Sequence, residues 1–167
     1  MKHWLIPTAV VAGLIATASP VSAANGVAPI NVGGSGDLDG FCDFEVDFTL
    51  TGKSKVIETG NERRIITSPG QKITLTANGK TFTSVITGVR FERDVVVNGE
   101  TIIETEVRGR NILTNPLPTP ESPGSARPGL FLVVGNFNFA VDEDGNEVRV
   151  FNADGPGKVT DVCAALS

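Results

Sequence analysis

The fold of this chain is decided by one stretch, Gly129-Leu-Phe-Leu-Val-Val-Gly-Asn-Phe-Asn-Phe-Ala-Val141. Residues 130–134 are apolar at every position, which is typical of a β-strand covered on both faces. Beyond Gly135 the pattern becomes one-sided, because phenylalanines alternate with Asn136 and Asn138. The stretch predicts the central strand of a β core, with Gly135 marking either a bulge or a close backbone approach.

A second strand pattern runs from Cys42 to Leu50. Apolar residues at 42, 44, 46, 48 and 50 alternate with acidic residues and threonine at the positions between them. Such alternation is typical of a strand with one buried and one wet face. We therefore expect a strand here, with Cys42 on its buried face.

Two Asn-Gly dipeptides predict β-hairpins. Around Asn78-Gly79, a two-residue loop keeps the apolar side chains on one face. Around Asn98-Gly99, the same loop length would set Phe91 opposite Glu106 and mix the two faces. We therefore expect a three-residue loop, residues 97–99, at the second hairpin.

The remaining segments complete an all-β pattern. Further strands are expected at residues 55–59, 63–68, 139–141, 147–151 and 158–164. The Pro-rich loop 115–129 cannot join a ladder, so we expect an extended connection that can cross between two sheets. Because no helical period persists, the predicted class is an antiparallel β-sandwich or barrel of roughly eight or nine strands.

The first part of the chain predicts export. Residues 1–23 read as a signal peptide, with a basic start, an apolar run and small residues before a cleavage site after Ala23. The apolar run is too short for a permanent membrane span. Residues 24–40 are rich in glycine and predict a flexible leader, and residues 41–167 predict a single β-sandwich domain. A secreted protein, outside the cell or associated with its envelope, is expected.

Charge limits the partners. Without the signal peptide, the chain has 13 basic and 19 acidic residues. This acidity argues against nucleic acid or an anionic membrane as the partner. A protein or another ligand of the cell envelope remains as the expected partner.

The cysteine pair is expected to be structural. Cys42 and Cys163 are the two cysteines of the chain, and an isolated pair in an exported protein most simply forms one disulfide. The strand from Cys42 and the last strand ending at Cys163 are then expected to be neighbours, in the same sheet or facing each other across the core. There is no Cys-x-x-Cys spacing that would indicate redox chemistry.

The residue types exclude several kinds of enzyme. The one histidine and the one tryptophan lie in the signal peptide, and there is no tyrosine. A mature chain without imidazole cannot hold a Ser-His-Asp or Cys-His system, or a zinc site that needs histidine. No cofactor is expected.

Carboxylates are the remaining catalytic candidates. Asp43, Glu45 and Asp47 form a row on the wet face of the predicted 42–50 strand. A glycosidase needs two acids on opposite sides of a cleft, whereas neighbours on one open face indicate a solvated surface. These residues are therefore expected to be surface residues.

Two weak calcium patterns and one basic spot are the other candidates for a binding site. Asp37 to Gly40 contains Asp-x-Asp-Gly, and so does Asp142 to Gly145, where Asp142, Asp144 and Asn146 are the possible ligands. A hairpin turn explains the second segment without a metal. Residues 108–111 read Arg-Gly-Arg-Asn and are expected to be ordinary surface, although such a spot can hold an anion.

The chain resembles small exported bacterial proteins of unassigned activity. The resemblance rests on residues 42–44, the Gly-Asn-Phe-x-Phe motif at 135–139, the turn at 142–146 and the Asp-Val-Cys-Ala-Ala-Leu-Ser segment at 161–167. It implies export and a β fold, and it brings no catalytic residue.

Together these features predict a secreted, non-enzymatic β-sandwich that acts as a binding or structural module at or outside the cell envelope. The alternative is a secreted, carboxylate-dependent hydrolase acting on glycans, which would have to use acids such as Asp43, Glu45 and Asp47.

Overall fold

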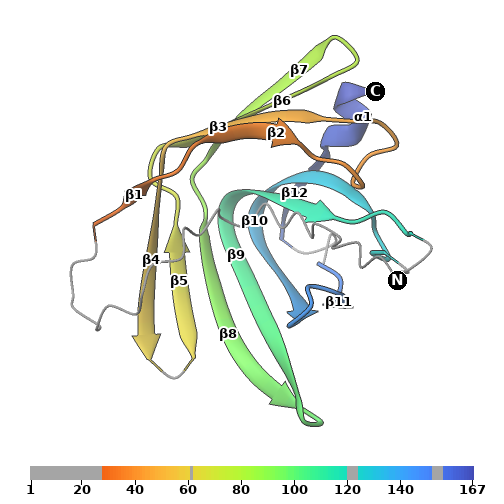
Figure 1. Cartoon of the computed structure of the whole chain (residues 1–167). Coiled ribbons are helices and arrows are strands. Elements are labelled where there is room, and N and C mark those ends of the chain that lie inside the picture. Colours follow the sequence, from red (N-terminus) through yellow and green to blue (C-terminus); the bar gives the residue numbers. More distant parts are fainter. Residues whose placement is uncertain (1–27, 61, 120–123, 152–155) are drawn as a thin grey trace, which may run out of the picture.

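The computed structural model describes residues 28–60, 62–119, 124–151 and 156–167. These residues form two antiparallel sheets and one short helix, α1 (Figure 1). The large sheet has the order β1-β4-β5-β8-β9-β10-β11, with β12 also paired to β10, and the small sheet has the order β2-β3-β6-β7. The predicted all-β class is confirmed, and the two-sheet arrangement is that of a sandwich.

The elements have the following bounds: β1 Ile30–Asn31, β2 Gly34–Asp37, β3 Asp47–Thr51, β4 Lys53–Gly60, β5 Arg63–Thr67, β6 Gln71–Ala77, β7 Lys80–Ile86, β8 Val89–Val97, β9 Glu100–Asn115, β10 Gly129–Asp142, β11 Glu147–Arg149, β12 Gly157–Asp161 and α1 Val162–Leu166.

Four strands of the large sheet bend and continue into the small sheet. β1 leads into β2, β4 follows β3, β5 leads into β6, and β8 follows β7. The order β1-β4-β5-β8 in the large sheet therefore matches the order β2-β3-β6-β7 in the small sheet. Two of the bends lie at Gly52 and at Pro69-Gly70, where Lys53 N donates to Pro69 O at 3.2 Å. If each bent pair is counted once, the described residues form eight extended runs, within the predicted range.

The two sheets separate where β8 leaves β9. The β8–β9 ladder ends at the pair Val89 and Arg108, after which β7 belongs to the small sheet while β9 continues beside β10. A side chain at Gly88 would not fit, because its Cβ would lie 1.9 Å from Asn111 Nδ2. A side-chain-free residue thus allows the two layers to diverge.

The first hydrophobic core fills the space between the layers. Leu130 of β10 is fully buried there against Ile73 and Leu75 of the small sheet. Ile112 and Leu132 are partly buried and pack against the same cluster.

The second core covers the opposite face of β10. Its buried members are Val107, Leu113, Phe131, Val133, Phe137 and Phe151. The Phe151 ring centroid lies 5.3 Å from that of Phe131 and 6.2 Å from that of Phe137. Asn136 and Asn138 are exposed, so the predicted change from two-sided to one-sided burial along β10 is confirmed.

Gly135 makes a close backbone approach and not a bulge. The β9–β10 ladder runs through the pair Gly109 and Gly135 without a shift in register. At Gly135 φ is +140°, and a Cβ would lie 2.7 Å from Gly157 Cα and 2.7 Å from Pro156 O. Glycine is therefore required both by the backbone conformation and by the neighbouring β12.

The beginning of the described chain corrects one prediction. Residues 28–40 were expected to belong to a flexible leader, but β1 and β2 lie in this segment and Leu38 is only 1% exposed. The glycines that suggested flexibility lie in and next to a short edge strand. Residues 24–27 of the expected leader, like the signal peptide at 1–23, lie outside the described residues.

Two predicted strands are shorter than expected. β3 begins at Asp47, although the burial of Cys42 and Val46 keeps the predicted alternation. The last strand ends at Asp161, whose carboxylate Oδ1 accepts a hydrogen bond from Ala164 N at 2.9 Å and caps α1. An N-cap aspartate favours a helix turn over further strand, which the apolar pattern alone did not reveal.

One hairpin prediction is confirmed and the other is wrong. Ala77 pairs with Lys80 across Asn78-Gly79, as expected. Val97 pairs directly with Glu100, so Asn98-Gly99 also forms a two-residue loop. No residue of β8 is fully buried, so no apolar face fixes its register. The turn decides instead, because Asn98 and Gly99 have φ of +54° and +87°, as a type I′ turn requires.

The Pro-rich loop is not a crossover between sheets. It joins β9 to β10, which are antiparallel neighbours from Asn115 and Gly129 onward. Leu117 N donates to Gly40 O at 2.7 Å, and Ser125 Oγ donates to Glu147 Oε2 at 2.6 Å. The described part of the loop is thus tied back onto the fold by hydrogen bonds. Residues 120–123 lie outside the described residues.

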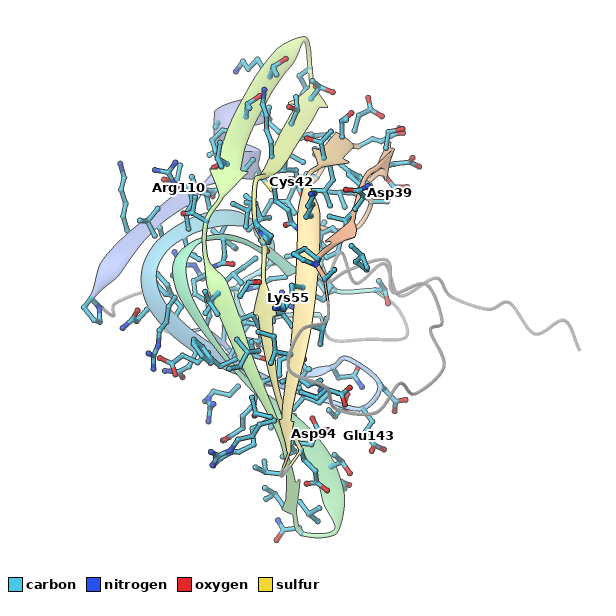
Figure 2. The ribbon with its side chains drawn as sticks, turned by 90° about the vertical axis from the view of Figure 1, so that its left-hand side faces the viewer. Asp39, Cys42, Lys55, Asp94, Arg110 and Glu143 are labelled. Carbon is cyan, nitrogen blue, oxygen red and sulfur yellow. A yellow bond between two sulfur atoms is a disulfide. The ribbon has the colours of Figure 1, made fainter. Side chains whose placement is uncertain are left out.

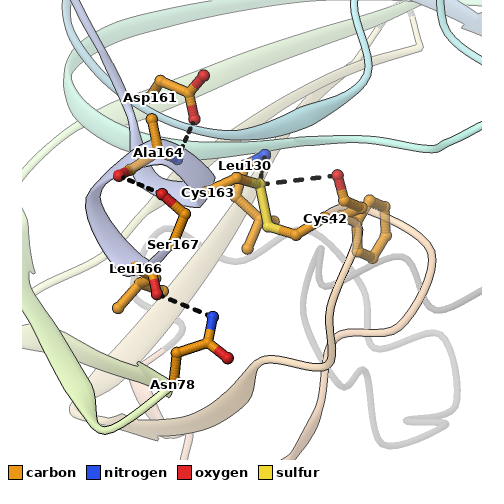
Figure 3. Close-up of a disulfide and its surroundings, with 9 residues drawn as sticks. Cys42, Asn78, Leu130, Asp161, Cys163, Ala164, Leu166 and Ser167 are labelled. Atoms are coloured by element: carbon orange, nitrogen blue, oxygen red, sulfur yellow. Dashed lines mark hydrogen bonds between the residues drawn. A yellow bond between two sulfur atoms is a disulfide. The ribbon is translucent and has the colours of Figure 1, made fainter.

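The predicted disulfide is present. The Cα atoms of Cys42 and Cys163 are 5.6 Å apart (Figure 3). It joins the loop before β3 to α1, so, contrary to the prediction, neither cysteine lies within a strand, and β3 and β12 belong to different sheets. Leu130 N donates to Cys163 Sγ at 3.3 Å, and Asn78 Nδ2 donates to Leu166 O at 3.1 Å. These contacts attach α1 to β10 and to the small sheet.

Breaking the disulfide should destabilise the domain without abolishing it. The chain-entropy model gives at most about 4 to 5 kcal/mol for so long a loop, which corresponds to a fall in Tm of about 10 °C or more. Cys42→Ser with Cys163→Ser, or reduction, should show this shift in circular dichroism melts while the β spectrum at room temperature persists. Titration of two free thiols in the unreduced protein would contradict the bond.

Gly135→Ala should cost more than an ordinary glycine replacement. Gly79→Ala is the control, because Gly79 has φ of +73° and a Cβ added there would have no neighbour within 4 Å. The control should lose about 1 to 2 kcal/mol from backbone strain alone. Gly135→Ala should lose about 2 kcal/mol more, because the methyl group meets Gly157 and Pro156. Equal losses in urea unfolding would contradict the close approach.

Candidate functional site

The part of the large sheet that lies beyond the first core presents a face rich in charged side chains, which we call the charged face. Its side chains come from β5, β8, β9, β10 and β11, and strand register sets them in two rows across the sheet. One row contains Arg63, Arg93, Glu104, Ala140 and Arg149. The other contains Ile65, Phe91, Glu106 and Asn138.

A shallow groove of about 480 Å³ lies over these rows, and we call it the charged groove. Four of the eight arginines of the chain line it from the face that carries these rows: Arg63, Arg93, Arg108 and Arg149. Two glutamates line it from the same face: Glu104 and Glu106. Figure 2 shows the side chains of this end of the sheet, near the labelled Asp94.

Glu104 links two arginines at the centre of the first row. Arg93 Nη2 lies 2.5 Å from Glu104 Oε2, and Arg149 Nη1 lies 3.5 Å from Glu104 Oε1. The hydrogen bond from Arg93 lowers the pKa of Glu104 below its ordinary value of 4.5, and the charges of both arginines add to this. Glu104 is therefore a carboxylate at neutral pH.

Glu106 and Arg108 form a two-pronged pair in the second half of the groove. Arg108 Nε and Nη2 donate to the two carboxylate oxygens at 2.7 and 3.1 Å. These hydrogen bonds lower the pKa of Glu106 and raise that of Arg108. The Arg108 guanidinium also lies 4.8 Å from the centre of the Phe91 ring. Phe91 is thus covered by a cation and flanked by an acid.

Arg63 differs from the other arginines of the groove. It is exposed, and its guanidinium has no ion pair within the described part of the chain. Its Cα partner on β8 is Arg93, so two positive side chains stand directly opposite each other. Like charges at such positions destabilise a sheet.

The other charged residues of β5 and β8 are paired with one another. Arg64 contacts Glu92 at 3.1 Å and Asp94 at 2.9 Å, and Arg90 contacts Glu92 at 3.4 Å. The Glu92 side chain is only 14% exposed. These side chains alternate with those of the two rows and lie on the opposite face of the sheet, so the network stabilises the sheet behind the groove.

The carboxylates predicted from sequence do not form a cleft. Asp43, Glu45 and Asp47 are all exposed, in the loop before β3 and at its first residue. Asp47 borders a small hollow beside the β6–β7 turn, and among the described residues no other carboxylate lines that hollow. The structure therefore does not bring together two acids there.

The calcium candidates of the second segment are used by a turn. Asp142 Oδ1 accepts from Asn146 N at 2.7 Å, and Asp142 Oδ2 accepts from Asn146 Nδ2 at 2.9 Å. Burial raises the pKa of Asp142, but the hydrogen bonds from Asn146 and the turn backbone outweigh it and lower the pKa. No group of three or more metal-binding side chains, Asp144 included, occurs within the described ranges.

The basic spot at residues 108–111 is divided by the fold. Arg108 enters the groove, Arg110 is exposed outside it, and Asn111 is buried at the point where the sheets diverge. The groove itself was missed, because its arginines are scattered from residue 63 to residue 149. The correct two-residue loop at Asn98-Gly99 was the signal that could have placed Arg93 opposite Glu104.

No protein-family model, curated protein or solved structure matches the chain. The only helix in the described residues is α1, and no helix there is long and apolar enough to cross a membrane.

The ion pair at Glu104 should give a small acid-sensitive contribution to stability. Because the folded pKa lies below 4.5, the contribution is present above the unfolded pKa and is lost as pH falls through the folded pKa. The pair is partly exposed, so it should contribute only about 0.2 to 1 kcal/mol. Carboxyl NMR titration should place Glu104 below 4.5 and move it upward in Arg93→Gln. A Glu104 pKa at or above 4.5 would contradict the pairing.

Proposed function

We propose that this protein is an exported, non-enzymatic β-sandwich that binds an anionic ligand at or outside the cell envelope, through the charged groove. The observation that carries the proposal is the gathering of four of eight arginines on one face of one groove in a chain of net charge −5. Solvated surface charge would not by itself concentrate one residue type there.

The charges of the groove support an anionic ligand. The four arginines and two glutamates that line it leave an excess of two positive charges, although the chain as a whole is acidic. Arginine presents a planar fork of donors that matches oxyanions in two-pronged contacts. All cations of the groove are arginines, which favours recognition of a defined oxyanion over a general attraction.

Two features of the sequence support export and a non-enzymatic role. Residues 1–23 read as a signal peptide, and a chain cleaved after Ala23 contains no imidazole. The two groove glutamates, Glu104 and Glu106, lie among arginines and have a lowered pKa, which suits ion pairing and not proton donation.

Binding and turnover can be separated with the purified exported protein. It should be retained on immobilised polygalacturonate despite its excess of acidic over basic residues, and salt should release it. A parallel screen with glycan, peptide and ester substrates should show no turnover. Hydrolysis that Asp43→Asn or Glu45→Gln abolishes would favour the alternative, a carboxylate-dependent hydrolase.

Glu104→Gln should bind the anion more tightly, because it removes a competing charge and frees Arg93 and Arg149. The gain should be about threefold, the Coulomb energy of one charge about 7 Å away in water. Asp43→Asn is the matched control, since it removes one negative charge from an exposed site outside the groove. An equal gain in both variants would mean that only net charge matters and would contradict the groove.

A further inference from the structure

We infer that Arg63 and Arg93 together bind the carboxylate of an acidic sugar, and that the sugar ring lies over the neighbouring row of the charged groove. This inference rests on the proposed function, because it names the ligand class of the same groove. It adds an anchor point, a chemical group and an orientation.

The strand register creates the anchor. Arg63 and Arg93 are Cα partners on adjacent strands, which lie about 4.8 Å apart in a sheet. Arg63 has no ion pair within the described ranges, and Arg93 uses Nη2 for Glu104. Each guanidinium has five N–H donors, so both retain donors for a shared anion. An anion between them would replace a repulsion between like charges with two attractions.

The charge balance favours a carboxylate over a phosphate monoester. Glu104 is bonded to Arg93, and Glu106 lies in the adjacent row. These two acids would repel a group that carries two negative charges. A group with one negative charge can bind the free N–H donors of Arg63 and Arg93 and is repelled least by the two glutamates.

The second row suits a ring with hydroxyl groups. Ile65 is a half-buried neighbour of the anchor and offers apolar surface, next to Phe91, which the Arg108 guanidinium covers. Glu106 and Asn138, their partners further along the row, can accept or donate hydrogen bonds. A sugar acid has a carboxylate for the two arginines, apolar ring C–H groups next to it, and hydroxyl groups further away. A glutamate side chain has no hydroxyl groups that could bond to Glu106 and Asn138.

The test uses three probes of defined chemistry with the whole exported protein. The probes are a galacturonic acid oligomer, the same oligomer as its methyl ester, and poly-L-glutamate, each measured by isothermal titration calorimetry. The acid oligomer should bind, and the ester should bind at least about tenfold more weakly, because it loses charge-assisted hydrogen bonds. Poly-L-glutamate should also bind at least about tenfold more weakly, because it has no hydroxyls for the second row.

Three variants place the anchor. Arg63→Gln should weaken binding of the acid oligomer about tenfold or more, and Arg93→Gln should do the same. Arg110→Gln is the matched control, because Arg110 is an exposed arginine outside the groove, and its binding should be unchanged. Melting curves of all three variants should match that of the parent protein within the small range expected of exposed residues.

The outcomes separate this inference from the proposed function. If polyanions still bind and Arg149→Gln or Arg108→Gln weakens them while Arg63→Gln does not, the anchor is wrong and the groove remains. Equal binding of the acid oligomer and its ester, or preference for poly-L-glutamate, overturns the acidic sugar. Loss of affinity in Arg110→Gln equal to that in Arg63→Gln overturns the groove itself.

Discussion

Burial of both faces of β10 is the constraint on which the rest of the structure depends. One face needs the small sheet as a cover, and the other needs the cluster that contains Phe151. A single flat sheet cannot supply both covers, so four strands bend out of the plane and form a second layer. Once the layers diverge at Gly88, the far end of the large sheet is left without a cover on the charged face. The groove is a direct result of where the second layer ends.

The apolar pattern was a sound guide wherever a side chain is fully buried. It located β10, the change of burial after Gly135, the register at Asn78-Gly79 and the pairing of Cys42 with Cys163. A core rejects a one-residue slip, because the slip would expose its whole apolar set. In these regions the correct register is therefore much lower in free energy than a register shifted by one residue, which makes it predictable from the pattern.

The pattern failed where no core imposes a register. β8 has no fully buried residue, and the α1 segment contains apolar residues that fit a strand as well as a helix. In both places local chemistry decided the outcome, through the positive φ of Asn98 and the capping carboxylate of Asp161. The charged groove depends on the β8 register, so it could not be found from a pattern that placed β8 one residue out of step. The glycine-rich edge strand β2 was not predicted for a related reason. Its position is set by pairing with β3 and not by its own side chains.

The Cys42–Cys163 bond also has a mechanical meaning. The two residues are 121 positions apart, so nearly all of the described fold lies inside one covalent loop. A pull applied at Ile30 and at Ser167 would peel β1 and β2 from their edges and would then meet the sulfur bridge. Tension would pass through that bridge and α1, while the long strands β9 and β10 would carry none of it. Under such a load the large sheet would stay intact and would lose only its edge strand β1.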